Sequence, residues 1–197
     1  VFDELGLLFR EPEFLLREEL REVSIYNAIL LALAAGSPTN SEISKATGIG
    51  DRALHYYLST LVELGYLQRR FPLTGTPPTA RQVRYSLEDP LLRFWFRFVY
   101  PNLSLIARLG AAPAVRELVL PELESYFGHG FERLCREALP ALYAREGVRA
   151  GFEVGEYWDK DTQIDVVGLR QDNWTDLGEC KWGHVGSANA LRAELRE

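Results

Sequence analysis

The stretch QIDVVGLRQDNWTDLGECKW (residues 163–182) decides the fold of the second half of the chain. Two runs in which apolar residues recur, 162–169 and 174–182, flank the polar segment 171–173. A period of two predicts strands, and three polar residues between them predict a β-hairpin with a three-residue loop. Because both runs are largely apolar, we expect their charged side chains to lie at the edge of a core.

The length of this loop sets the register of the two strands. A loop of residues 171–173 pairs Arg170 with Trp174, and counting inward from that pair places Asp165 directly opposite Glu179. Opposed carboxylates repel each other, so we expect a cation between them. Lys181 follows Glu179 by two residues and lies on the same face of a strand, where it neutralises part of the charge.

Two carboxylates and a lysine are suited to phosphodiester hydrolysis. Mg²⁺ takes few protein oxygens and completes its shell with water and substrate phosphate. A lysine beside it stabilises the negative charge that develops during attack by water. The alternative is an exposed sheet face that carries an ordinary acid–lysine cluster and contributes little to stability.

An α/β lobe is predicted around this hairpin, beginning near residue 110. Helical spacing extends from 118 to 146, with Pro140 marking a bend or a break. The period changes to two over 148–158, which predicts a strand before the hairpin, and 186–197 return to helical spacing.

The first half of the chain predicts a winged helix. Helical patterns cover Val23–Leu33, 40–48 (with Asn40 as the expected N-cap) and 51–64. A short turn with glycine between the second and third helices is typical of a helix-turn-helix. Strand-like ends at 66–71 and 82–87 flank a centre rich in Pro, Gly and Thr, which predicts a hairpin with a long loop.

Residues 66–87 hold the clearest basic concentration in a chain of net charge −6. They include four arginines and no acid, at the place where a wing contacts phosphate. The alternatives are a cationic hairpin edge that discourages aggregation and a protein–protein module. With one residue of the third helix, the predicted nucleic-acid-binding residues are Arg52, Arg69, Arg70, Arg81 and Arg84.

The segment 89–110 predicts a helix that begins at Asp89-Pro90. Its aromatic side chains cover most of the helix circumference. We interpret it as a buried helix that connects two lobes rather than as a base-stacking platform. The aromatic residues are Phe94, Trp95, Phe96, Phe98 and Tyr100.

The composition narrows the class of protein. Cys135 and Cys180 form no CxxC pair, which fits a reducing cytoplasm and argues against a disulfide scaffold or a zinc ribbon. No apolar run approaches the length of a membrane span. The chain has no methionine, begins at Val1 and stops within a helical pattern, so we expect a piece of a longer protein.

The segments IDVVG (164–168) and GECKW (178–182) resemble the signature of the PD-(D/E)xK superfamily of restriction-endonuclease-like nucleases. Ile164 stands where the family's motif has proline. The resemblance implies that Asp165 and Glu179 bind Mg²⁺ or Mn²⁺ and that Lys181 is the catalytic lysine. It also implies that Glu132, in GFERLCREAL (130–139), supplies the additional acid on a helix, acting through a metal-bound water.

A second resemblance covers essentially the whole chain. It rests on EFLLREELRE (13–22), SEISKATGI (41–49), LHYYLSTLVELGYL (54–67), DPLLRFWFRFVYPN (89–102) and GECKWG (178–183). These segments are similar to the C-terminal region of archaeal-type ATPases, which implies an AAA-like P-loop lobe, a winged helix and a nuclease-like domain of unknown function. Because no GxxxxGK[ST] loop occurs here, we expect the ATPase lobe outside this chain, as a partner.

The predicted fold class is α+β. An α-rich winged helix-turn-helix precedes an α/β restriction-endonuclease-like lobe with a mixed central sheet. The predicted boundaries are a linker and helix at 1–20, the winged helix at 21–88, the connecting helix at 89–110, and the nuclease-like domain, truncated at its C-terminal end, at 111–197.

The predicted function is DNA binding with metal-dependent phosphodiester hydrolysis in the cytoplasm, with no membrane contact and with homo-oligomerisation left open. One alternative is a non-catalytic module that binds DNA or protein for the ATPase. Another is a winged-helix transcription regulator whose second lobe senses a ligand.

Overall fold

The computed structural model describes the chain except for residues 5, 80–81, 184–186, 188 and 190–197. It divides into two compact units. The first comprises Val1–Arg70 and Val83–Pro121, and the second comprises Phe71–Gln82 and Glu122–Glu197. The first unit therefore extends past the boundary predicted near residue 110, and a short internal segment of the first half belongs to the second unit.

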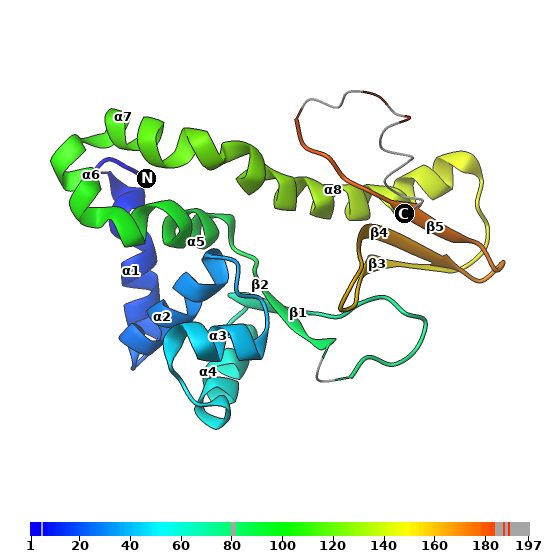
Figure 1. Ribbon diagram of the computed structural model, residues 1–197, viewed down its shortest axis with the longest axis horizontal. Helices are drawn as coiled ribbons and strands as arrows, with labels where there is room; N and C mark the ends of the chain where they lie inside the picture. Colours follow the sequence, from blue (N-terminus) through cyan, green and yellow to red (C-terminus); the bar gives the residue numbers. More distant parts are fainter. Residues whose placement is uncertain (5, 80–81, 184–186, 188, 190–197) are drawn as a thin grey trace. The chain divides into compact units, whose positions relative to one another are not determined.

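Four helices open the first unit, and three of them form the helix-turn-helix (Figure 1). Their apolar faces share one core, in which Ile29, Ile43, Leu54, Leu58 and Leu61 have no exposed surface. Spacing of three and four residues puts the leucines of the last helix on one face. The helices are α1 (Leu7–Glu19), α2 (Val23–Ala34), α3 (Asn40–Thr47) and α4 (Asp51–Glu63).

Local side-chain chemistry fixes both ends of α3. The Thr39 hydroxyl accepts a hydrogen bond from the Glu42 backbone N–H, and the Glu42 carboxylate accepts one from the Thr39 N–H, which makes a capping box. Thr39 is therefore the N-cap, and the prediction of Asn40 was wrong by one residue. Gly48 ends the helix in the left-handed region, at φ 71°.

The predicted hairpin forms between β1 (Leu67–Arg70) and β2 (Arg84–Leu87), an antiparallel pair with Leu67 opposite Leu87. The Tyr85 N–H donates to the Pro38 carbonyl at 2.7 Å, which ties the hairpin to the turn between α2 and α3. This is the wing of a winged helix.

The loop of the hairpin is folded into the second unit. The Leu73 N–H donates to the Glu156 carbonyl at 2.7 Å, and the Leu73 side chain lies against Gly155. The hairpin with a long loop is present as predicted, but its attachment to β3 through Leu73 was not predicted.

The aromatic segment after the hairpin is helical and buried, as predicted. The Asp89 carboxylate caps it by accepting from the Leu92 N–H at 2.8 Å. Trp95 is 2% exposed, and its indole N–H donates to the Phe9 carbonyl at 2.8 Å. This helix is therefore part of the first unit's own core. The segments are α5 (Pro90–Phe94), η2 (Trp95–Val99), η3 (Tyr100–Asn102), α6 (Leu103–Leu109), α7 (Ala111–Ala114), η4 (Val115–Val119) and η5 (Leu120–Glu122).

The second unit places one long helix against a three-stranded sheet (Figure 1). The helix is α8 (Leu123–Glu146), which continues through Pro140. The strands are β3 (Phe152–Trp158), β4 (Gln163–Arg170) and β5 (Thr175–Gly178), in the order β3-β4-β5.

Both strand pairs described in this sheet are antiparallel. The expectation of a mixed sheet is therefore not met within the described residues, because the consecutive strands are joined by short turns, which allow only antiparallel pairing. The final helix predicted for 186–197 lies almost wholly outside the described residues.

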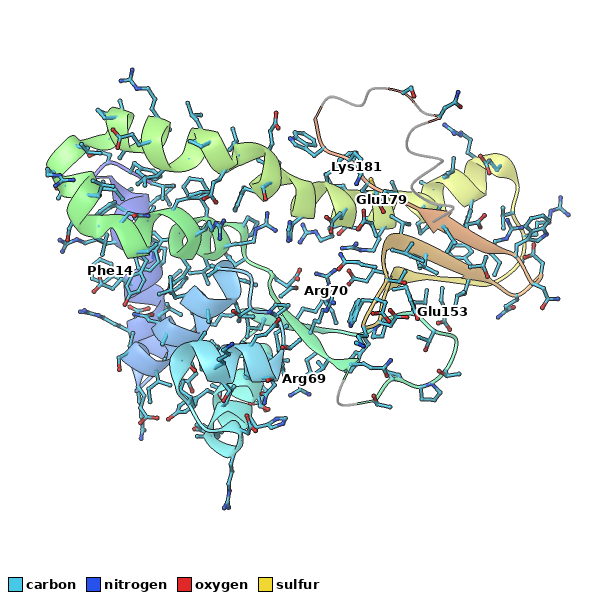
Figure 2. All side chains as sticks on the ribbon, in the orientation of Figure 1. Phe14, Arg69, Arg70, Glu153, Glu179 and Lys181 are labelled. Carbon is cyan, nitrogen blue, oxygen red and sulfur yellow. The ribbon has the colours of Figure 1, made fainter. Side chains whose placement is uncertain are left out.

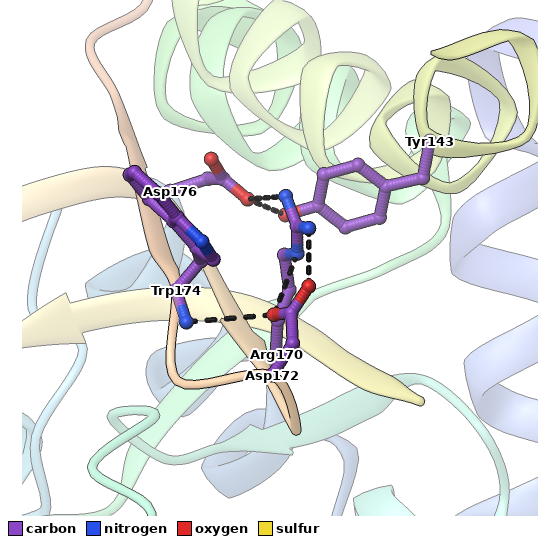
Figure 3. Close-up of polar contacts among 5 residues, drawn as sticks. All are labelled: Tyr143, Arg170, Asp172, Trp174 and Asp176. Carbon is purple, nitrogen blue, oxygen red and sulfur yellow. Dashed lines mark hydrogen bonds and ion pairs between the residues drawn. The ribbon is translucent and has the colours of Figure 1, made fainter. Parts of the chain in front are cut away.

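A close approach between α8 and β4 depends on Gly168. A Cβ added there would lie 2.0 Å from the Tyr143 hydroxyl oxygen, so only glycine lets the ring enter. The hydroxyl donates to the Asp176 carboxylate at 2.5 Å. Figure 3 shows Arg170 beside the Tyr143 ring, with ion pairs to Asp172 and Asp176.

No helix among the described residues combines the length and the apolar character needed to cross a membrane.

Candidate functional site

The β4–β5 hairpin has the loop and the register predicted from the sequence. The Arg170 N–H donates to the Trp174 carbonyl at 3.0 Å, and Asn173 adopts φ 69° at the end of the loop. Val166 lies opposite Gly178, the last residue of β5, so the paired register stops one residue short of Asp165 and Glu179.

The third strand is shorter than predicted. The run 174–182 was expected to form it, but β5 ends at Gly178. The reason lies in the next backbone donor, because the Cys180 N–H donates to Oδ2 of the Asp165 side chain at 2.9 Å. A side chain thus takes the place of a strand carbonyl, and the chain leaves the ladder.

Asp165 lies at a break in the ladder between β3 and β4. Gly155 pairs with Val167 and Tyr157 pairs with Ile164, so the single residue Glu156 faces two residues of β4. A bulge of this kind bends the strand and redirects side chains. The Asp165 side chain is enclosed as a result, and the residue is 7% exposed.

Glu179 and Lys181 form the open side of the site (Figure 2). Lys181 Nζ lies 2.9 Å from Glu179 Oε1, with side chains 43% and 23% exposed, respectively. The two residues are therefore neighbours, as the alternation of the sequence predicts. An ion pair at this exposure contributes little to stability, so it leaves both groups able to bind another charge.

Glu132 approaches the site from α8. It is half-buried, and its charge reaches the Cys180 thiol together with that of Asp165. The pKa of this thiol is raised to about 12, first by burial and then by a hydrogen bond with Cys135. α8, β4 and the segment after β5 thus all lie close to the Cys180 thiol.

Aromatic contacts hold the segment after β5 against α8. The Trp182 ring lies 5.6 Å from the Phe127 ring and 5.5 Å from the Phe131 ring, measured between centroids. Trp182 therefore packs on α8, although the residue is 48% exposed.

Two charged residues beside Asp165 were not predicted. Arg136 Nη1 donates to the Asp165 carbonyl at 2.8 Å and lies 3.7 Å from Glu156 Oε2. The sequence offered one indication that Glu156 is buried. It alternates with Val154 and Trp158 along a strand, so it shares a face with Trp158, which is itself buried. Nothing comparable marked Arg136.

The carboxylates of the candidate site are of the chemical type that binds a divalent cation. Carboxylate oxygens are the ligands that Mg²⁺ and Mn²⁺ prefer, and Asp165 and Glu179 carry them. Among the described residues, no group of three or more His, Cys, Asp or Glu side chains is gathered closely enough to hold a metal ion. The ligand set of Glu132, Asp165 and Glu179 therefore stays a prediction.

In the first unit, α4 presents a polar and aromatic face. Arg52 and His55 are exposed, and Tyr56 is 65% exposed. The opposite face is the buried leucine stripe, so the polar face is free of the unit's core. In a helix-turn-helix this second helix of the motif enters the major groove.

Arginines of the hairpin follow α4 in the chain, and Figure 2 labels two of them, Arg69 and Arg70. Arg69 is exposed, and its Nη2 donates to the Ser59 hydroxyl of α4 at 3.1 Å. Arg70 and Arg84 are half-buried and lie directly opposite each other across the ladder. Arg81 lies outside the described residues.

Two protein families match different parts of the chain. Residues 27–70 match the IclR helix-turn-helix domain. Residues 95–193 match DUF234, a family described as archaeal and bacterial proteins of unknown function. The helix-turn-helix prediction is thereby confirmed, whereas the nuclease-like fold and the ATPase lobe stay predictions.

One curated relative is an uncharacterised protein, MJECL04, of Methanocaldococcus jannaschii. It is 30% identical over 174 residues, which cover 87% of this chain and 39% of the relative. The chain thus spans well under half the length of that relative. No solved structure matches the chain.

Proposed function

The chain belongs to the DUF234 family of archaeal and bacterial proteins, and we propose that it binds double-stranded DNA through its helix-turn-helix. The observation that carries this proposal is the exposed face of α4, where Arg52, His55 and Tyr56 lie beside an arginine held by Ser59. Side chains of this kind donate to base edges and phosphates in the major groove.

Electrostatics makes this proposal testable in a chain of net charge −6. A chain with excess negative charge is repelled by DNA at long range, so binding depends on the local arginines. Each phosphate contact releases counterions and steepens the dependence of affinity on salt. If Arg52 and Arg69 contact phosphates, they contribute to the slope of log K against log salt.

The test is a salt titration of duplex binding, followed by fluorescence anisotropy, with the Arg52→Ala/Arg69→Ala double variant. We expect affinity to fall and the slope of log K against log salt to decrease by about one per lost phosphate contact. The matched control is Arg17→Ala, which removes an exposed cation of α1 that pairs with Glu13. Equal affinity and slope in the double variant and the wild type would contradict the proposal.

The second unit supports a second proposed function, metal-dependent hydrolysis of phosphodiesters in DNA. It is favoured by one arrangement: a buried Asp165 whose carboxylate accepts from the Cys180 N–H, beside Glu179 in sequence, with the Lys181 ammonium 2.9 Å from the Glu179 carboxylate. This is also the arrangement that the resemblance to PD-(D/E)xK nucleases implies.

Each residue has a role in this proposal. Asp165 and Glu179, with Glu132 on α8, would hold Mg²⁺ or Mn²⁺. The cation, when bound, would supply positive charge against the charge that develops on the phosphate. Lys181 orients the scissile phosphate and stabilises the same developing charge through its ammonium group. An ATPase lobe in a longer protein would be the partner, and the length of the M. jannaschii relative leaves room for one.

Cleavage assays on plasmid, linear, single-stranded and branched DNA with Mg²⁺ or Mn²⁺ test this function. We expect nicking or cutting that Asp165→Asn and Lys181→Ala each reduce by about a hundredfold or more. Lys160→Ala and Asp161→Asn are matched controls, because both residues are exposed in the β3–β4 turn of the same unit. Intact DNA in every arm would contradict it and favour a non-catalytic binding module or a winged-helix regulator.

A further inference from the structure

A nearly buried ion pair lies directly behind the candidate catalytic aspartate. The side chains of Arg136 on α8 and Glu156 on β3 are 14% and 10% exposed, and Arg136 Nη1 lies 3.7 Å from Glu156 Oε2. Removing two charges from water is costly, and such pairs often contribute nothing to net stability. Their presence here therefore calls for a role other than stabilising the fold.

The second contact of Arg136 indicates that role. The same nitrogen, Nη1, donates to the backbone carbonyl of Asp165 at 2.8 Å. A hydrogen bond from a cation is shorter and stronger than one between neutral groups, and it directs the peptide plane of the acceptor. One guanidinium thus joins β3 through Glu156 to β4 at Asp165.

The bulge explains why this carbonyl needs a side-chain donor. Asp165 and Val166 together face Glu156, so the regular ladder is interrupted at Asp165. A buried carbonyl that leaves the ladder has to find another partner. Arg136 is that partner, and it satisfies the carbonyl without restoring the ladder.

Glu156 is itself held from its other side. Its carbonyl accepts from the Leu73 N–H at 2.7 Å, and the neighbouring Gly155 lies against the Leu73 side chain. Glu156 is 8% exposed. Its backbone is therefore anchored by the loop of residues 71–82, and its carboxylate holds the guanidinium in a defined place.

We propose that Arg136, held by Glu156, is a positioning residue that fixes Asp165 in the β4 bulge with its carboxylate directed toward the segment of Glu179 and Lys181. The inference rests on the proposed hydrolytic function. Asp165 is held at two points: its carbonyl accepts from Arg136, and its carboxylate accepts from the Cys180 N–H at 2.9 Å. Losing the first contact frees the peptide plane and so weakens the second.

The Cys180 amide reports this placement without any need for catalysis, because its hydrogen bond ends on the Asp165 carboxylate. Native-state hydrogen exchange resolved at this amide is compared in the wild type and in Arg136→Met/Glu156→Leu. The double variant removes both charges and leaves no isolated buried ion, so it folds where Arg136→Ala alone can fail. Loss of the directing hydrogen bond is expected to speed Cys180 exchange about tenfold or more.

Two further variants separate positioning from general support of the fold. Arg136→Lys keeps a charged donor near the carbonyl, so it is expected to restore part of the Cys180 protection. Arg133→Ala is the matched control on α8, where the pair with Glu137 is 50% and 61% exposed, and it is expected to leave exchange unchanged. Unchanged Cys180 exchange in the double variant, or equal acceleration of all amides in β3, β4 and α8, would overturn the proposal.

Cleavage adds a second and separate readout. If the wild type cuts DNA, the double variant is expected to need several times more Mn²⁺ for half-maximal rate, with the DNA affinity of the first unit unchanged. An unchanged Mn²⁺ requirement alongside faster Cys180 exchange would overturn the assignment of Arg136 to the reaction, but not the proposed hydrolysis. Absence of cleavage in the wild type would remove the hydrolysis, while the exchange measurement would still decide whether Arg136 positions Asp165.

Discussion

The charged residues of the two candidate sites differ in exposure. In the first unit, Arg52 and Arg69 are exposed. In the second unit, Asp165 and Glu156 are 7% and 8% exposed, and each is bonded to a named protein group. Exposed charges contribute to binding with little effect on stability, whereas buried charges depend on one another.

The difference teaches how substitutions in each unit should be interpreted. Loss of an arginine on α4 or β1 is expected to change affinity for an anion and leave the fold intact. Loss of a group behind Asp165 is expected to change the fold and the site together. Variants in the second unit therefore need a structural readout beside any activity readout.

Gly168→Ala is expected to have the largest effect on stability. The effect should be confined to the second unit. The new methyl group would lie 2.0 Å from the hydroxyl of Tyr143, which is 3% exposed and is hydrogen-bonded to Asp176. We expect a loss of about 3 kcal/mol in the free energy of unfolding of this unit. Urea denaturation with hydrogen exchange resolved by unit measures it.

Gly128→Ala is the control for that substitution. It lies in the same helix as Tyr143, and an added Cβ would meet no atom within 4 Å. Alanine is the better helix former, so stability is expected to hold or to rise slightly. Wild-type stability in Gly168→Ala would contradict the close contact between α8 and β4.

The Tyr143 hydroxyl is expected to make the stability of the second unit depend on pH, with an effect of intermediate size. Its pKa is raised from 10.0 to about 12, first by burial and then by the hydrogen bond to Asp176. The folded state therefore keeps the proton that the unfolded chain loses above pH 10. The stability that the protonated Tyr143 hydroxyl contributes is complete below pH 10 and is lost as the pH rises toward 12.

Tyr143→Phe separates this effect from other alkaline titrations. The variant is expected to lose about 1–2 kcal/mol at neutral pH, with the loss becoming smaller between pH 10 and 12. Tyr66 of the first unit also has a raised pKa, caused by burial and by its hydrogen bond to Glu19. Tyr66→Phe is thus the counterpart that should act on the other unit, and a parallel pH profile for Tyr143→Phe and the wild type would contradict the assignment.

Thr39→Ala is expected to have the smallest of the three effects and to act on the first unit. It removes the hydroxyl that accepts from the Glu42 N–H at the start of α3. Loss of an N-cap costs about 1 kcal/mol, which thermal unfolding of the first unit should show. Ser41 is exposed in the same helix, and Ser41→Ala is expected to change the free energy of unfolding by only a few tenths of a kcal/mol.

Features made by neighbouring residues were predictable from the sequence. Asp89-Pro90 opens a helix as expected, and the loop 171–173 produces the predicted register. Caps and turns depend on bonds that span three or four residues, so a short window of sequence contains both partners. The error of one residue at Thr39 arose because either of two adjacent polar residues suits an N-cap.

Features made across the chain were not predictable in this way. The contact between Leu73 and Glu156 joins residues from the two halves of the sequence, and Arg136 meets Asp165 across 29 positions. The bulge at Asp165 leaves no mark in the apolar alternation. The attachment of the hairpin loop to β3 and the ion pair behind Asp165 were consequently not predicted.

By itself, the sequence determined the helix-turn-helix and the register of the β4–β5 hairpin, because periodicity, caps and loop length act locally along the chain. Only the tertiary structure decided that Asp165 is enclosed, that β5 stops where its next amide binds a side chain, and that Arg136 and Glu156 lie behind the site. Burial and charge pairing depend on which distant surfaces meet, and packing chooses those surfaces by shape and by the need to satisfy every enclosed polar group.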